Sequence, residues 1–193
     1  MSILGGPASY NAWAAGRKAR KLAQLTDEER ALVEDFCANV RGEDYEHTSR
    51  LFDQIVFIAP LFRTAELQEA AGGTSFVYYF TPESNDPLMR CGHGVEVPTV
   101  FGKPELGRPL GLDFEETFSR TLRDMWVQFA KTGNPSLSAE ASPDGREKVW
   151  PAYDPKDRYV MCFDEDNVHV EHESERGIVS WDKCYFLTKY YVI

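Results

Sequence analysis

The stretch LMRCGHGVEVPTVFG, residues 88–102, places a histidine between two glycines and directly before an apolar run. Because Gly92 and Gly94 carry no side chains, the backbone beside His93 can approach other groups closely and adopt conformations that bulkier residues avoid. A histidine in such a loop can be a catalytic base or an ordinary turn residue. The sequence on either side of the loop has to decide between these two interpretations.

Two helical segments are predicted upstream of the loop. Thr26 and Glu29 form a capping-box pattern, after which apolar residues recur at helical spacing until Gly42 ends the helix. A second helical region is expected over about residues 45–71, with a kink or interruption near Pro60.

Strand and helix signals also flank the loop directly. The run TSFVYYF, residues 74–80, is apolar on both faces, which favours a buried strand in a covered sheet. Downstream, Asp113 and Glu116 are expected to open a long helix that Gly133 ends. Its apolar face is predicted to contain Phe114, Phe118, Leu122, Met125, Trp126 and Phe129.

The last third of the chain predicts two strands and a terminal helix. Residues 159–163 are expected to form a strand, residues 167–173 a more exposed strand, and residues 180–193 a docked helix. One buried strand and two further strands make a thin sheet for so much helix. We therefore predict an α/β fold in which helices pack on a small, incomplete sheet, with residues 1–193 as a single segment.

Composition limits the classes of partner. The 193 residues carry a net charge of −10 and have a pI near 4.9, which argues against nucleic acid and anionic membranes as partners. No apolar run approaches the length of a membrane span, and the start lacks the order of a signal peptide. These features favour a soluble cytoplasmic protein.

The four cysteines are far apart and contain no C-x-x-C pair. Cys37, Cys91, Cys162 and Cys184 each lie among apolar or aromatic residues, so small buried thiols in a reducing compartment are expected. His169 and His172 could be considered as a metal pair, but residues three apart in a strand point to opposite faces. We predict no metal site and no cofactor.

Three motifs, taken together, resemble the C-terminal part of the type-B carboxylesterases, the family of the cholinesterases and bacterial para-nitrobenzyl esterases. They follow the family's order and approximate spacing, and the resemblance covers roughly residues 50–165. The matches are H-G-x-E-[LVI]-P-x-V-F-G at residues 93–102, W-x-x-F-A-x-T-G-x-P at residues 126–135 and W-P-x-Y at residues 150–153.

The resemblance implies the C-terminal portion of an α/β-hydrolase, with His93 as the catalytic histidine. In that role the imidazole takes a proton from a serine hydroxyl and returns it to the leaving alcohol, which its near-neutral pKa permits. Gly92 and Gly94 would allow the loop to carry the ring to the serine. Glu96 would support the loop structurally.

One departure from the family pattern is large. No G-x-S-x-G nucleophile motif occurs in the sequence, and Ser75, in GTSFV, is the nearest miss. The serine and the acid of the triad are therefore expected on a missing N-terminal portion or on a companion chain. We expect the chain alone to be inactive and the completed triad to hydrolyse small carboxylic esters.

Three fates remain open from the sequence. The chain could be one piece of a split carboxylesterase that donates His93 to a companion. It could instead be a non-catalytic module that covers the same surfaces by forming a homodimer, or a truncated product. Its methionine start fits a complete reading frame.

Overall fold

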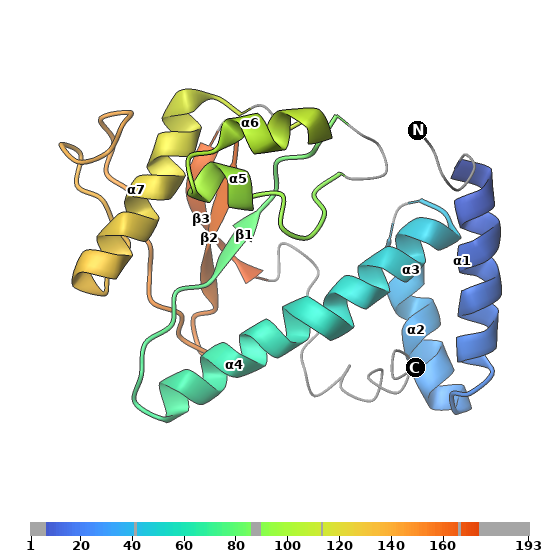
Figure 1. The fold of residues 1–193 in the computed structure, drawn as a ribbon. Coiled ribbons are helices and arrows are strands. Elements are labelled where there is room, and N and C mark those ends of the chain that lie inside the picture. Colours follow the sequence, from blue (N-terminus) through green and yellow to red (C-terminus); the bar gives the residue numbers. More distant parts are fainter. Residues whose placement is uncertain (1–6, 41, 86–89, 113, 166, 174–193) are drawn as a thin grey trace. The chain divides into compact units, whose positions relative to one another are not determined.

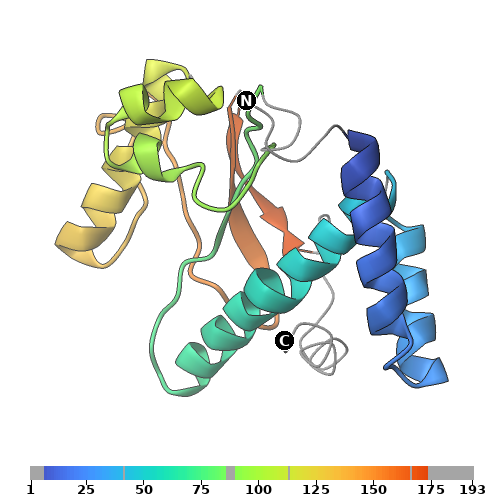
Figure 2. The same cartoon turned by 45° about the vertical axis from the view of Figure 1, so that its right-hand side comes forward.

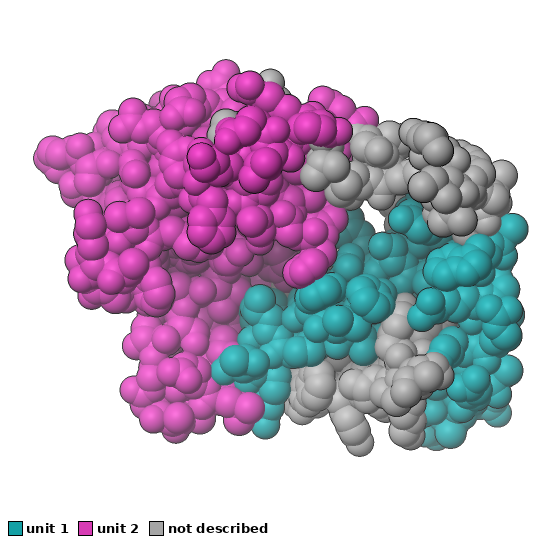
Figure 3. All heavy atoms as spheres, viewed as in Figure 1, with its two compact units in different colours: residues 1–64, 177–193 teal, residues 65–176 magenta. Residues whose placement is uncertain are grey.

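The computed structural model describes residues 7–40, 42–85, 90–112, 114–165 and 167–173. The chain divides into two compact units, residues 1–64 with 177–193 and residues 65–176 (Figure 3). The assignment of the whole chain to a single segment stays a prediction. The terminal helix expected over residues 180–193 lies outside the described residues.

The described part of the first unit includes the helices α1 (Pro7–Leu22), α2 (Asp27–Ala38) and α3 (Asp44–Asp53), and it continues beyond α3 to residue 64 (Figures 1 and 2). The predicted capping box of α2 is confirmed. The Thr26 hydroxyl accepts from the Glu29 amide at 3.2 Å, and the Glu29 carboxylate accepts from the Thr26 amide at 3.0 Å. The helix ends at Ala38, earlier than the expected stop at Gly42. The core of this unit contains Leu25, Val33, Cys37, Leu51, Ile55 and Ala59.

The helical region predicted over residues 45–71 is also confirmed, with a local change of helix type. A π-helical turn, η1 (Gln54–Ile58), joins α3 to α4 (Ala59–Ala70), and the Ala59 amide donates to the carbonyl of Gln54. Proline lacks an amide hydrogen, and its ring clashes with the carbonyl four residues earlier. The wider π turn directly before Pro60 lets the chain remain helical where a kink was expected.

The second unit contains a three-stranded sheet among its described residues: β1 (Tyr78–Phe80), β2 (Tyr159–Asp164) and β3 (Asn167–His172), in that order. β1 runs parallel to β2, and β3 runs antiparallel to β2 (Figure 1). The two strands predicted near the end of the chain are thereby confirmed. The structure is a mixed fold of helices and a small sheet, in agreement with the α/β class.

The strand expected over residues 74–80 is shorter and less buried than predicted. Only Tyr78–Phe80 form β1, and all three side chains are half-buried. Among the described residues β1 pairs only with β2, so it is an edge strand. An apolar run of this kind indicates a covered strand, but its length as a strand depends on how many neighbours pair with it.

Helix α7 (Glu116–Thr132) covers one face of the sheet (Figures 1 and 2). It begins after Glu115, whereas Asp113, one of the two residues expected to open it, lies outside the described residues. Gly133 ends it as predicted, with φ of +77° and its amide donating to the Phe129 carbonyl at 2.8 Å. The core between α7 and the sheet contains Phe118, Leu122, Met125, Leu137, Trp150, Met161 and Phe163.

Four aromatic rings meet in this core. Tyr78, Trp126, Trp150 and Phe163 are all in mutual contact, with ring centroids between 4.9 and 5.9 Å apart. The Trp150 indole also donates to the Val77 carbonyl at 3.1 Å. Aromatic pairs of this geometry stabilise by roughly 0.5–1.5 kcal/mol each beyond the area they bury. The cluster therefore fixes β1 against both β2 and α7.

In the loop after α7, Asp144 holds a nearly buried lysine. The Lys148 ammonium donates to the Asp144 carboxylate at 2.7 Å. The Ser142 hydroxyl donates to the same carboxylate at 2.8 Å. Burial works in the opposite direction, but these hydrogen bonds lower the pKa of Asp144 to about 2. A pKa below its unfolded-state value means that the charged form stabilises the fold.

We expect Asp144→Asn to lower the free energy of unfolding by about 1 kcal/mol near neutral pH, allowing for the solvent exposure of the carboxylate. The folded-state pKa lies below the unfolded value, so this contribution is present above about pH 4 and is lost as the pH falls toward 2. Urea unfolding at pH 6.5 and pH 2.5 measures the difference. Asp157→Asn, at an exposed carboxylate of the same unit, is the control. A stability gap that is equally large at pH 2.5 would contradict the assignment.

Candidate active site

His93 lies in an exposed turn between the end of β1 and the short helix α5 (Val97–Val100). The turn is built from backbone hydrogen bonds, in which the Val95 amide donates to the Gly92 carbonyl at 3.3 Å and the Val97 amide to the Gly94 carbonyl at 3.2 Å. Gly94 has φ of +82°, a conformation that residues with side chains rarely adopt. This places a constraint on the residue directly after His93.

Two side-chain hydrogen bonds attach this loop to β1. The Cys91 thiol donates to the Phe80 carbonyl at 2.8 Å, and the Tyr78 hydroxyl donates to the Glu96 carboxylate at 3.4 Å. Cys91 is exposed, which corrects the expectation that all cysteines are buried: it lies in the loop, where its thiol reaches a strand carbonyl. The histidine turn is therefore held on both sides by the same strand.

The environment of the Tyr78 hydroxyl disfavours its ionisation. Burial, followed by the negative charge of Glu96 and the hydrogen bond to it, raises the pKa of Tyr78 to about 12. The phenol therefore stays protonated at physiological pH and continues to donate to Glu96. The role of Glu96 as a support of the loop stays a prediction, and the structure adds Tyr78, from the predicted strand over residues 74–80, as its hydrogen-bond partner.

The helices after His93 expose apolar side chains. On α5 and α6 (Pro104–Gly107), and between them, the exposed fractions are 46% for Val97, 74% for Phe101 and 64% for Leu106. Buried Val95 and Thr99 lie beside them in the sequence. We call Val97, Phe101 and Leu106 the α5–α6 surface.

The two histidines weighed as a metal pair are not brought together. His169 is opposite Cys162 in the β2–β3 register, whereas His172 is opposite Tyr159 and packs against its ring. The structure instead places Cys162, His169 and Glu171 in one cluster. Side chains two apart in a strand share a face, so His169 and Glu171 could be placed together from the sequence. Which β2 residue lies opposite them depends on the strand register, which the sequence does not show.

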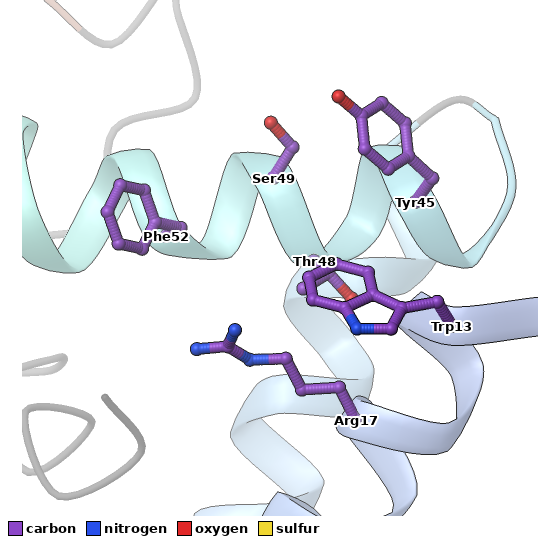
Figure 4. Close-up of a pocket in the computed structure, with 6 residues that line it drawn as sticks. All are labelled: Trp13, Arg17, Tyr45, Thr48, Ser49 and Phe52. Carbon is purple, nitrogen blue, oxygen red and sulfur yellow. The ribbon is translucent and has the colours of Figure 1, made fainter. Parts of the chain in front are cut away.

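The first unit contains a separate hollow between α1 and α3 (Figure 4). It includes none of the residues predicted for catalysis, and the Arg17 guanidinium lies over the Trp13 ring, 5.5 Å from its centroid. The hollow is lined by Trp13, Arg17, Tyr45, Thr48, Ser49 and Phe52.

Comparison with known proteins relates this arrangement to a family. The profile described as "Carboxylesterase family" matches residues 17–180, which include the histidine turn, all three strands and α7. The chain belongs to the carboxylesterase family. In the part of this carboxylesterase-family chain that the structure describes, no helix is long and apolar enough to cross a membrane.

Individual relatives agree with the family assignment. Rabbit (Oryctolagus cuniculus) "Cocaine esterase" is 30% identical over 130 residues, which cover 62% of this chain and 23% of that protein. The crystal structure of the Geobacillus stearothermophilus carboxylesterase EST55 at pH 6.2 is similar in fold, with a TM-score of 0.60 and 22% identity. That similarity covers 84% of this chain and 33% of the bacterial chain. This carboxylesterase-family chain therefore spans about a quarter to a third of the length of these relatives.

The hydrogen bond from Tyr78 to Glu96 gives a testable expectation for the histidine turn. Tyr78→Phe keeps the ring in the aromatic cluster but removes the donor, which we expect to loosen the turn by about 1 kcal/mol. The Val95 and Val97 amides should then exchange with deuterium about fivefold faster, whereas Leu122 in α7 should be unaffected. Tyr159→Phe, at an exposed tyrosine on β2, is the control. Equal exchange at Val95 in both variants would show that the hydrogen bond does not hold the turn.

Proposed function

We propose that this chain supplies the catalytic histidine, His93, to a carboxylic ester hydrolase whose serine and acid lie on an N-terminal portion outside these 193 residues. The observation that carries the proposal is the exposed histidine turn, held to β1 and located within the segment that matches the carboxylesterase family. The absence of G-x-S-x-G from the sequence supports a nucleophile that lies outside these residues.

The chemistry assigns two proton transfers to His93 in each half-reaction, one to the imidazole and one from it. The imidazole accepts the proton of the serine hydroxyl as its oxygen attacks the ester carbonyl, and then gives that proton to the departing alcohol. The same histidine then takes a proton from the water that attacks the acyl-enzyme, and returns it to the serine oxygen as the acyl–oxygen bond breaks, which releases the carboxylic acid. An exposed imidazole can meet a serine on another segment or chain only if that segment docks beside it.

The α5–α6 surface fits such docking. Phe101 and Leu106 are more than half exposed and follow His93 closely in the chain, so a segment that covers them would also enclose the histidine turn. The relatives are three to four times longer than their matched portion, which supports the missing esterase portion as the occupant. Small carboxylic esters are the proposed substrates. A non-catalytic homodimer is the alternative.

Co-production of this chain with a portion of the Geobacillus carboxylesterase tests the proposal. The portion of EST55 preceding its matched segment is co-produced with this chain, and hydrolysis of a short-chain p-nitrophenyl ester is measured. We expect the assembled pair to hydrolyse the ester and each part alone to be silent. His93→Ala should lower kcat by at least about 1000-fold without changing assembly, whereas the control His172→Ala should have no effect.

Two results would overturn the proposal. Turnover by the chain alone that His93→Ala removes would mean that a nucleophile lies within these residues. A co-purifying, folded pair without turnover, together with a stable homodimer of the chain alone in light scattering, would favour the non-catalytic module.

A further inference from the structure

A cluster of three different ligand types lies on the sheet, apart from the histidine turn. One ligand atom each from Cys162, His169 and Glu171 lie within 4.8 Å of one another. Cys162 is fully buried, whereas the side chains of His169 and Glu171 are 31% and 17% exposed. The thiol is therefore the innermost of the three groups, whereas the imidazole and the carboxylate are partly exposed to solvent.

The strand register produces this grouping. Cys162 on β2 is directly opposite His169 on β3, and Glu171 follows His169 by two residues on the same face. Side chains of directly opposed residues have Cβ atoms about 4.5–5.5 Å apart. Two consecutive strands of the chain thus hold all three groups, so forming the cluster requires no distant segment.

The two ring nitrogens of His169 face different oxygen atoms. Nδ1 lies 3.4 Å from the Asn167 carbonyl, which can accept a hydrogen bond but cannot donate one. Nε2 lies 3.2 Å from a carboxylate oxygen of Glu171. In the tautomer that donates from Nδ1 to the carbonyl, the Nε2 lone pair and the carboxylate oxygen can bind one metal ion together.

The geometry suits a tetrahedral ion. With bonds of about 2.0–2.2 Å to nitrogen and oxygen, neighbouring ligand atoms of a zinc site are about 3.3–3.5 Å apart, close to the observed Nε2–Oε2 separation. An Nδ1 proton directed at a carbonyl or carboxylate is the usual outer contact of a metal-bound histidine. The Asp164 carboxylate, 3.6 Å from Nδ1, lies on this side of the ring.

We propose that Cys162, His169 and Glu171 form a three-ligand site for Zn²⁺, with the fourth tetrahedral position left to water. The thiolate and imidazole favour Zn²⁺ over Mg²⁺ or Ca²⁺, which prefer oxygen ligands. The site is independent of ester hydrolysis. It differs from the histidine pair considered in the sequence, because only one of those two histidines takes part.

Cobalt substitution of the full 193-residue chain tests the site. The reduced, metal-free protein is titrated with Co²⁺, which reports a thiolate ligand by a charge-transfer band and tetrahedral geometry by intense visible bands. We expect saturation at one Co²⁺ per chain and displacement of the spectrum by Zn²⁺. Cys162→Ser should remove the charge-transfer band.

His169→Asn and Glu171→Gln should each weaken Co²⁺ binding by more than about tenfold, since even changes to outer-shell partners cost 10- to 100-fold. Glu171→Gln preserves side-chain shape at a partly exposed position, so it remains informative if Cys162→Ser fails to fold. The matched controls are Cys91→Ser for another thiol, His172→Asn for the opposite face of β3 and His93→Ala for the proposed catalytic residue. All three should bind Co²⁺ like the parent chain.

The proposal is overturned if the parent chain develops no charge-transfer band on titration with Co²⁺. It is also overturned if the band survives in a folded Cys162→Ser variant, or if Glu171→Gln binds Co²⁺ as tightly as the parent chain. None of these results depends on whether an esterase is assembled, so the zinc site and the proposed ester hydrolase stand or fall separately.

Discussion

Contact among four aromatic rings is the interaction on which the second unit depends. Tyr78 comes from β1, Trp126 from α7, Trp150 from the loop before β2 and Phe163 from β2 itself, and every pair among them is in contact. β1 has only three residues and one strand partner in the described part of the chain. So short a strand has few ladder hydrogen bonds, and ring packing must supply much of what fixes it.

The same aromatic cluster connects the core of the second unit to the histidine turn. Tyr78 presents its ring to the core and its hydroxyl to Glu96, so one side chain joins the sheet to the histidine turn. Two of the motifs that carry the family resemblance contribute their tryptophans to this cluster, and the third contributes the turn itself. Their separate positions in the sequence therefore converge on one structural task, which is to hold His93 at a defined place at the end of β1.

The sequence predicted features that depend on neighbouring residues and missed those that depend on distant ones. The Thr26 capping box, the end of α7 at Gly133 and the strand expected over residues 167–173 are local signals, and each is found in the structure. The true length of β1 and the exposure of Cys91 depend on which segments pair and pack nearby, which spacing does not encode. The meeting of Cys162 with His169 requires the strand register. In the candidate site, the motif at residues 93–102 predicted the histidine turn. The hydrogen bond from Tyr78 to Glu96 joins residues far apart in the sequence, so only the structure shows it.

The edge position of β1 also restricts the symmetry of anything that extends the sheet. A twofold axis that relates two identical chains across an edge strand reverses the strand direction, so a homodimer joined through β1 would contain an antiparallel β1–β1 pair. A different polypeptide faces no such restriction and can continue the parallel arrangement that β1 already has with β2. The direction of the next strand would therefore distinguish self-assembly from completion by a different segment, independently of any catalytic residue.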